Sequence, residues 1–540
     1  MYPLQKLTKC LVVLNSKMIN LIYLLKKLSS VLLIVLFLVQ VNHAQTLKNS
    51  REFVVKTPFV ESDGRIVSQV ENNIAYLLGK SKGGNAQYSQ YFLQAYDKNL
   101  GLIWSVKKEF EEEDQVLGIQ LLNDKVVLFW VSHDLKKKSK TVTAQAFSKS
   151  SGDISKEIEM IVQGVGEWKI VPNKGMSASG LENVINSGNR KDLVTPLEYQ
   201  FKLRTSPDKS KVLLYSYDYS KQDLYLDLNI FDASLTQINE ARIPVNKGFI
   251  HQENLINNRG EVFMINRRET GLIAVVHYKI DEKKSNYLEI DASNTLRGSF
   301  YSQLVKDDHL WVAHVNTRDT QLAGVSYSEF DFKEDKVGKI MYHPMGDEFK
   351  AKIASLDDNK NEIMDEDWSN FQIIDFQILS NGGKSIIIEQ QNYQSRGYFY
   401  NPEAGNDISQ WTGERLGELS VGNAFILRFD SNDNFQWDYP LLKAQKGNAH
   451  EGLNIIGLKS SISSEGDVKM VYELFGRGHH SINYVNVDGK KGNILKNKVL
   501  ENPEKLNVLL PFTTWFSDAF ILVGKKGFSG KSSTLLLYQN

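Results

Sequence analysis

Aromatic and arginine side chains gather in one segment of the chain, residues 392–420, with glycines between them. Tyr, Trp and Arg dominate binding surfaces because each offers a large apolar face with a polar end. Flat aromatic rings also suit sugar rings. This segment is therefore the strongest candidate for ligand binding, although a long loop that packs its own aromatics on a scaffold has the same composition. Its candidate residues are Tyr393, Arg396, Tyr398, Tyr400, Trp411 and Arg415.

A second candidate group is basic and contains Arg477, His479 and His480. Adjacent histidines face opposite ways on a strand, whereas in a loop both could reach one metal ion. The chain contains no H-E-x-x-H or comparable metal-ligand spacing. We therefore assign these three residues to ligand binding, or to a solvated rim, and we predict no metal site.

Motifs for established cofactors are incomplete. The segment ending Gly530-Lys-Ser resembles a phosphate-binding loop, but Lys525 stands where its first glycine is needed. The segment starting at Asp430 resembles a calcium loop, but Phe435 replaces its glycine and Leu441 its final glutamate. We predict no cofactor and assign no catalytic residue. Acidic residues 365–367 keep one alternative open, a pair of carboxyl groups acting on a polysaccharide.

The start of the chain reads as a secretory signal peptide. Lys26 and Lys27 precede an apolar run, Leu28–Val41, and Ala44 then offers a cleavage point. That run of 14 residues is shorter than the ~20 needed to span a bilayer. The predicted mature chain, residues 45–540, would be periplasmic, cell-surface or extracellular and would not span a membrane. Cys10 is the only cysteine, so the mature chain would contain neither disulfides nor thiolate metal ligands.

The composition argues against nucleic acid as a partner and favours a β-rich fold. The 64 basic and 64 acidic residues balance, so no global charge attracts nucleic acid. Aromatics are plentiful and prolines number only 11, which suits β-strands.

A β-branched and aromatic strand recurs along the chain, mostly at intervals of 40 to 60 residues. That period is typical of four-stranded propeller blades. The eight copies are Ile74–Leu78, Lys125–Val131, Lys211–Tyr217, Glu261–Asn266, His309–His314, Lys384–Glu389, Val468–Glu473 and Asp518–Val523. We predict an all-β fold, a β-propeller of about eight blades, with seven blades or two stacked smaller sheets as alternatives. The predicted units are 64–110, 115–162, 199–246, 249–292, 298–343, 370–440, 452–500 and 505–540.

The ends of the repeat indicate how the ring closes and how its hairpins turn. The last unit has only three good strands, and Arg51–Lys56 could supply its fourth. A second recurring strand ends in Asp97, Asp232, Asp430 or Asp488, whose side chains can bond the backbone two residues on. Trp104 and Trp437 each follow such an aspartate by seven residues. We expect both tryptophans to pack between blades.

Blade geometry predicts where the long segments lie. Loops joining second to third strands, and one blade to the next, emerge on one face of a propeller. The insertions 163–198, 344–369 and 392–420 occupy such positions, so they should share a face, called here the loop-rich face. The opposite face, called here the tight-turn face, should carry only tight turns.

The Asp97…Trp104 and Asp430…Trp437 hairpins resemble those of pyrroloquinoline-quinone-type propellers, over two blades only. They are one residue short and lack the usual Thr-Gly, so the resemblance does not imply the quinone. More generally, the chain resembles uncharacterised exported propellers of Bacteroidota. We predict a non-catalytic binding or scaffolding propeller that recognises a glycan or an envelope protein. The alternative is an enzyme acting on polysaccharide, of glycosidase or lyase type.

Overall fold

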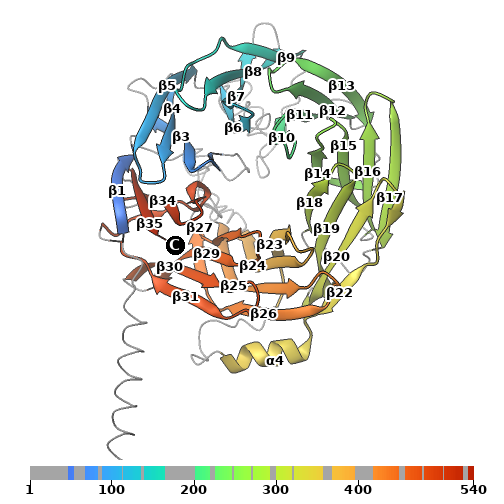
Figure 1. Ribbon diagram of the computed structural model, residues 1–540, viewed down its shortest axis with the longest axis vertical. Helices are drawn as coiled ribbons and strands as arrows, with labels where there is room; N and C mark the ends of the chain where they lie inside the picture. The colour runs from blue at the N-terminus through green and yellow to red at the C-terminus, as the bar shows by residue number, and fades with distance from the viewer. Residues whose placement is uncertain are drawn as a thin grey trace, which may run out of the picture.

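Eight antiparallel sheets stand in a ring around a central axis (Figure 1). The predicted all-β propeller is confirmed, with eight blades. The computed structural model describes residues 47–53, 67–82, 88–111, 114–134, 139–164, 201–218, 225–245, 249–268, 272–291, 300–318, 321–356, 368–395, 417–448, 456–476, 479–502, 504–526 and 533–539. The predicted signal peptide lies outside these residues. Within them, no helix is both long and apolar enough to cross a membrane.

The first four blades each contain four strands, given from the axis outward. Blade 1 is β2 (Ser68–Glu71), β3 (Ile74–Lys82), β4 (Tyr88–Asp97) and β5 (Leu102–Glu111). Blade 2 is β6 (Gln115–Leu122), β7 (Lys125–Asp134), β8 (Ser139–Ser148) and β9 (Ile158–Gly164). Blade 3 is β10 (Phe201–Thr205), β11 (Lys211–Asp218), β12 (Tyr225–Asp232) and β13 (Gln237–Pro244). Blade 4 is β14 (Phe249–Ile256), β15 (Val262–Arg268), β16 (Leu272–Lys279) and β17 (Lys284–Asp291).

Three of the other blades carry an additional strand. Blade 5 is β18 (Phe300–Lys306), β19 (His309–Arg318), β20 (Gln321–Asp331), β21 (Lys336–Val337) and β22 (Met341–Pro344). Blade 6 is β23 (Phe371–Ile378), β24 (Lys384–Ser395), β25 (Gly417–Phe429), β26 (Phe435–Leu441) and β27 (Gln445–Asn448). Blade 7 is β28 (Leu458–Ile462), β29 (Val468–Gly476), β30 (His479–Val487) and β31 (Ile494–Val499). Blade 8 is β32 (Asn507–Val508), β33 (Thr514–Trp515), β34 (Ala519–Lys525), β35 (Ser533–Gln539) and β1 (Leu47–Phe53), with a short 3-10 helix, η4 (Leu510–Phe512), between β32 and β33.

In blades 1 to 7 the recurring apolar run forms the second strand from the axis. In blade 8 it forms β34, which occupies the same position. Such a strand is covered on both faces by the neighbouring blades, so its side chains are buried without alternation. Residues 126–131 of β7, for example, are all buried. The outer strand β13 instead alternates between half-buried and exposed positions, because it lies at the rim. Burial on both faces is therefore the physical origin of the repeat.

Strand β1 closes the ring, as predicted, by pairing antiparallel with β35. It begins at Leu47, before the predicted Arg51, and the structure describes it as far as Phe53. Phe53 is 1% exposed and its ring centroid lies 6.4 Å from that of Phe512. Residues 47–53 and 533–539 are thus held in one sheet, and Phe53 packs in the same core as blade 8.

The predicted hairpin chemistry is confirmed. The side chains of Asp97, Asp232, Asp430 and Asp488 each accept a hydrogen bond from the backbone N–H two residues on. Trp104 of blade 1 lies against Gly152 in the outer hairpin of blade 2, and its Nε1 donates to the carbonyl of Lys149 at 3.0 Å. The ring of Trp437 of blade 6 lies against Gly492 of blade 7, without a hydrogen bond from its Nε1. Both tryptophans therefore pack between blades.

Parts of the three predicted long segments belong to described elements. Residues 392–395 and 417–420 belong to β24 and β25, and 163–164 belong to β9. The segment 344–369 contains a helix, α4 (Asp347–Leu356), which the sequence interpretation missed. Phe349 and Ile353, one turn apart, are both buried, and Phe349 packs edge-on against Phe425 with centroids 5.0 Å apart. Figure 1 shows α4 outside the ring, beside blades 5 and 6.

Candidate functional site

The main predicted binding segment stands on a two-stranded stem formed by β24 and β25. Their pairing continues to Ser395 opposite Gly417, so the insertion proper is 396–416. Strand β27 pairs with residues 418–421 and widens the stem. Tyr393 belongs to this stem, with Leu419 as its backbone partner. Arg396, Tyr398, Tyr400, Trp411 and Arg415 lie outside the described residues.

Buried polar contacts fix the stem to blade 7. Lys443 and Glu389 form an ion pair of 2.8 Å, with side chains 0% and 1% exposed, and Lys443 also donates to Gln445 Oε1 at 2.6 Å. Burial lowers the pKa of Lys443, and the charge of Glu389 opposes that shift. Gln445 Nε2 donates to the carbonyls of Gly457 and Glu473 in the next blade. A buried charge pair with these partners is costly to break, so the stem is a rigid support.

The second predicted group lies at a hairpin of blade 7. His479 and His480 begin β30, with Gly476 and Phe475 as backbone partners. Arg477 lies outside the described residues. Their assignment to ligand binding stays a prediction.

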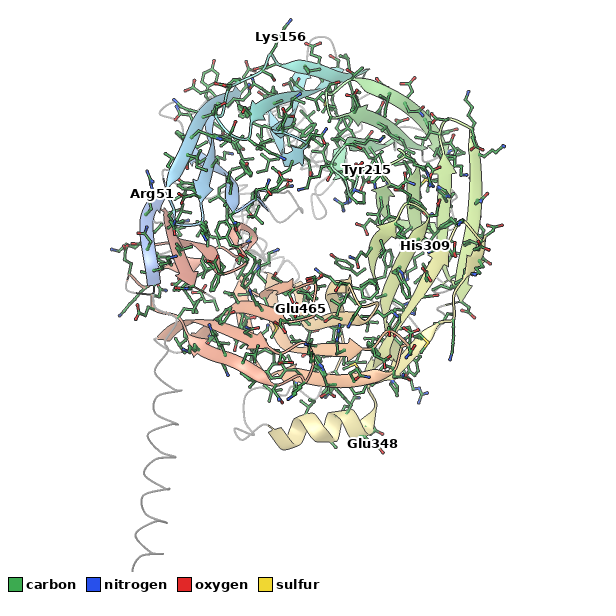
Figure 2. The ribbon with its side chains drawn as sticks, in the orientation of Figure 1. Arg51, Lys156, Tyr215, His309, Glu348 and Glu465 are labelled. Carbon is green, nitrogen blue, oxygen red and sulfur yellow. The ribbon has the colours of Figure 1, made fainter. Side chains whose placement is uncertain are left out.

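Seven polar residues, one from the innermost strand of each of blades 1 to 7, form what we call the axial belt. Arg204 Nη2 lies 3.2 Å from Glu253 Oε1, and Ser302 Oγ donates to the other oxygen of the same carboxylate. Hydrogen bonds also join Gln69 to Gln120 at 3.3 Å, and Ser460 to Asp375 at 3.3 Å. Tyr215, on the second strand of blade 3, lies at the inner edge of the ring (Figure 2). The members are Gln69, Gln120, Arg204, Glu253, Ser302, Asp375 and Ser460.

Asp375 of the belt and its neighbour Tyr301 are candidate acid–base groups. Burial raises the pKa of Asp375 to about 6, although Ser460 and Lys459 favour its charged form. Burial also raises the pKa of Tyr301, and the negative charges of Asp375 and Glu253 add to that effect. Tyr301 therefore lies under the influence of two carboxylates held by different blades. A neutral phenol can donate a hydrogen bond, and Asp375 could exchange a proton near neutral pH.

Sequence reasoning missed this belt, although one signal was available. Arg204, Glu253 and Ser302 follow one another at intervals of 49 residues, which is one blade. Each is a single polar residue in a short strand, so the strand pattern alone does not mark it.

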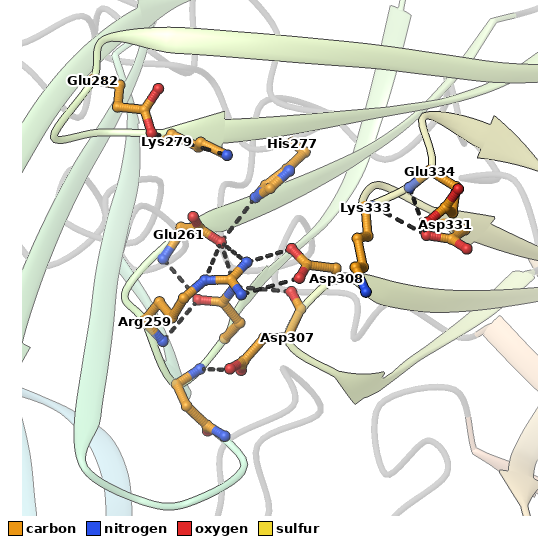
Figure 3. Close-up of polar contacts among 12 residues, drawn as sticks. Arg259, Glu261, His277, Lys279, Glu282, Asp307, Asp308, Asp331, Lys333 and Glu334 are labelled. Carbon is orange, nitrogen blue, oxygen red and sulfur yellow. Dashed lines mark hydrogen bonds and ion pairs between the residues drawn. The ribbon is translucent and has the colours of Figure 1, made fainter.

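A charged cluster on the tight-turn face joins blades 4 and 5 (Figure 3). The ligand atoms of Glu261, His277 and Asp308 lie within 4.8 Å of one another, a spacing that could suit a metal ion. Arg259, however, forms ion pairs with both Glu261, at 2.5 Å, and Asp308. The guanidinium already supplies the positive charge, and a divalent ion would have to displace it.

Further hydrogen bonds indicate that the cluster has a structural role. Glu261 Oε2 accepts hydrogen bonds from Asn257 at 2.6 Å and lies 3.1 Å from His277 Nε2. Burial alone would raise the pKa of Glu261, but His277, Arg259 and Asn257 together lower it to about 2. The turn also binds blade 5 directly, because the N–H of Asn258 donates to Asp307 at 3.0 Å. We therefore regard the cluster as a clasp between two blades.

Comparisons with known proteins show the fold alone. No family model matches the chain, and no curated protein matches its sequence. The chain is similar to the β-propeller domain of the Trilobed protease from Pyrococcus furiosus, with 11% identity and a TM-score of 0.34 over 79% of this chain and 94% of that one. It is also similar to the polysaccharide lyase Uly1, with 9% identity and a TM-score of 0.38 over 88% of this chain and 90% of that one. A third similar structure is a protein of unknown function from Bacteroides caccae, with 10% identity and a TM-score of 0.27 over 67% of this chain and 93% of that one.

Proposed function

We propose that this chain is an exported, non-catalytic propeller that binds a glycan or an envelope protein through its loop-rich face. The observation that carries the proposal is the stem made of β24, β25 and β27, with its buried Lys443–Glu389 pair. Long loops with aromatic and arginine side chains recognise ligands best when a rigid scaffold positions them. The stem gives residues 396–416 such a support.

Export is the second part of the proposal. It rests on the charged, apolar and small-residue pattern of residues 26–45 and on the predicted cysteine-free mature chain. Fractionation of cells that express the full chain tests this part. Recovery of an unprocessed protein from the cytoplasm would contradict it.

The stem permits a clean deletion. Because Ser395 and Gly417 are backbone partners, an Asn-Gly turn between them can replace residues 396–416 and close the hairpin. We expect this variant to keep the melting temperature of the full chain and to lose retention on a glycan array and in an envelope pull-down. A variant with a Gly/Ser segment of equal length separates the effect of side chains from that of loop length. Unchanged retention in both variants would overturn the proposal.

A specific observation favours one further candidate, an enzyme acting on polysaccharide. Asp375 and Glu253 both act on Tyr301, and the pKa of Asp375 is raised to about 6 by burial. Two carboxyl groups with different environments are the usual means of glycoside hydrolysis. If this candidate is correct, Asp375→Asn abolishes release of reducing ends from a polysaccharide, whereas Asp124→Asn on an exposed turn does not. Absence of cleavage by the unmodified protein, across neutral and acidic polysaccharides, excludes it.

A further inference from the structure

A pocket with a volume of about 230 Å³ lies among the innermost strands of four consecutive blades, 3 to 6. The strands concerned end at Thr205, Ile256, Lys306 and Ile378 and then lead into tight turns. The pocket therefore lies toward the end of the axis opposite the loop-rich face. Its volume is below the ~300–1,000 Å³ of pockets for drug-sized ligands, which indicates an occupant of about one ring. Its lining residues are Thr205, Pro207, Leu255, Ile256, Tyr301, Ser302, Gln303, Leu304, Phe376 and Gln377.

None of the lining side chains is charged near neutral pH. Among the described residues, the side chains of Thr205, Tyr301 and Gln377 have no hydrogen-bond partner. Gln303 accepts a hydrogen bond from the N–H of Ile378 at 2.9 Å, which orients its amide and leaves its NH₂ group as a donor. The pocket thus offers amide and hydroxyl groups that a ligand can use.

The polar groups stand beside an apolar wall. Phe376 is 0% exposed as a residue, and Leu255, Leu304 and Pro207 line the pocket next to it. The neighbouring carboxyl groups already have partners: Glu253 is bonded to both Arg204 and Ser302, and Asp375 accepts a hydrogen bond from Ser460. A ligand with a net charge would meet no free partner in the lining and would lose solvation on entry.

We propose that this pocket binds one uncharged sugar ring, of the hexose class. Such a ring presents hydroxyl groups on its edge and C–H groups on its faces. The hydroxyl groups match Tyr301, Gln303 and Gln377. The C–H groups match the accessible apolar atoms of Leu255, Leu304 and Pro207. Charged sugars lack a partner there, and a purely apolar ring would leave the amides unsatisfied.

This site is separate from the stem of β24 and β25, whose last described backbone pair is Ser395 with Gly417. A glycan bound at the loop-rich face and a ring bound in the pocket would be separate events. The two proposals can therefore fail separately. The variant that lacks 396–416 should still bind a single hexose.

The test uses the methyl α-glycosides of glucose, galactose and mannose as probes of the full-length protein, in calorimetry and ligand-observed NMR. We expect saturable binding of at least one, with weaker binding of glucuronate and cyclohexanol. Gln377→Leu and Tyr301→Phe should each weaken that binding about 3- to 10-fold, the effect of losing one hydrogen bond between neutral groups. Gln372→Leu, on the same strand β23 but outside the lining, should leave it unchanged.

Tyr301→Phe removes only a hydroxyl group, so it keeps the test valid if Gln377→Leu does not fold. Three results would overturn the proposal: no saturable binding of any hexoside, binding of glucuronate or cyclohexanol at least as strong, or equal losses in the Gln372 and Gln377 variants.

Discussion

Lys209 of blade 3 forms an ion pair with Glu71 of blade 1, with Nζ and Oε1 2.5 Å apart, across the tight turns of blade 2. Lys149 of blade 2 binds the other oxygen of the same carboxylate. One carboxylate therefore holds three successive blades on the tight-turn face. Burial alone would raise the pKa of Glu71, but the bonds from Lys149 and Lys209 outweigh it and hold the pKa below its usual value.

We expect Glu71→Gln to lower the stability of the fold by about 1–2 kcal/mol, because two partly buried ammonium groups lose their counter-charge. A carboxyl group with a lowered folded pKa stabilises above its unfolded pKa, near 4.5, and loses that effect as the pH falls through the folded value. The difference in stability between the variant and the unmodified protein should thus be largest at pH 7 and should shrink below pH 4. Thermal unfolding across pH 3–7 measures it.

The matched control is Glu109→Gln, which removes an exposed partner of Lys107. Exposed pairs contribute little, so its melting temperature should equal that of the unmodified protein. If both variants melt alike at pH 7, Glu71 does not tie the blades together.

The contact of Trp104 with Gly152 gives a second prediction. Gly152 has a φ of +72°, and a Cβ atom there would lie 2.8 Å from the indole ring. Gly152→Ala should therefore be destabilising by about 1–3 kcal/mol through strain and displacement of the ring. We expect a lower melting temperature together with red-shifted tryptophan emission.

Gly346→Ala is the control, because a Cβ atom at Gly346 would have no neighbour within 4 Å. Its melting temperature and emission should not change. A silent Gly152→Ala variant would show that the indole ring moves aside without cost.

The success and failure of the sequence interpretation have one physical cause, the number of faces that a strand buries. Strand β7 is covered on both sides, so residues 126–131 form an unbroken apolar run that is visible in the sequence. Strand β21, with two residues at the rim, leaves no comparable signal. The same reasoning explains why eight blades could be counted while β22, β27 and β33 were missed.

The candidate sites differ in how much of each could be predicted from the sequence. The aromatic insertion was visible from composition, but its stem depends on Lys443 and Gln445, which read as ordinary residues of a polar connection. The pocket depends on Gln377 and Tyr301, which approach each other only because the innermost strands converge on one axis. Convergence of that kind is a property of the ring, and no local pattern encodes it.

A third prediction concerns the seam between blades 7 and 8. Glu473 is 0% exposed, accepts the N–H of Val508 at 3.0 Å, and has a pKa raised by burial to about 8. Between pH 4.5 and pH 8 the folded state therefore keeps a proton that the unfolded state has released. Stability must fall as the pH rises through this window, by up to about 1.4 kcal/mol per pH unit.

Glu473→Gln removes this proton linkage and can still accept the N–H of Val508. We expect its melting temperature to exceed that of the unmodified protein at pH 8, with the difference shrinking toward pH 5. Glu465→Gln, on an exposed turn of the same blade, should follow the unmodified protein at every pH. Parallel curves for the Glu473 variant and the unmodified protein would mean that the buried carboxyl group does not titrate in this range.

The last prediction concerns ring closure. Phe53 of β1 lies in the core with Tyr96 of blade 1 and Phe512 of blade 8 at centroid distances of 6.5 and 6.4 Å. Phe53→Ala should cost about 3–5 kcal/mol, as for other buried aromatic truncations, and should open the seam that β1 seals. Hydrogen exchange should then rise first along β1 and β35, and later in blades 3 to 5. Ser50→Ala, on the same strand with an exposed side chain, should leave exchange at β35 unchanged. Uniform acceleration around the whole ring would show instead that the eight blades unfold as one unit and that the seam has no separate stability.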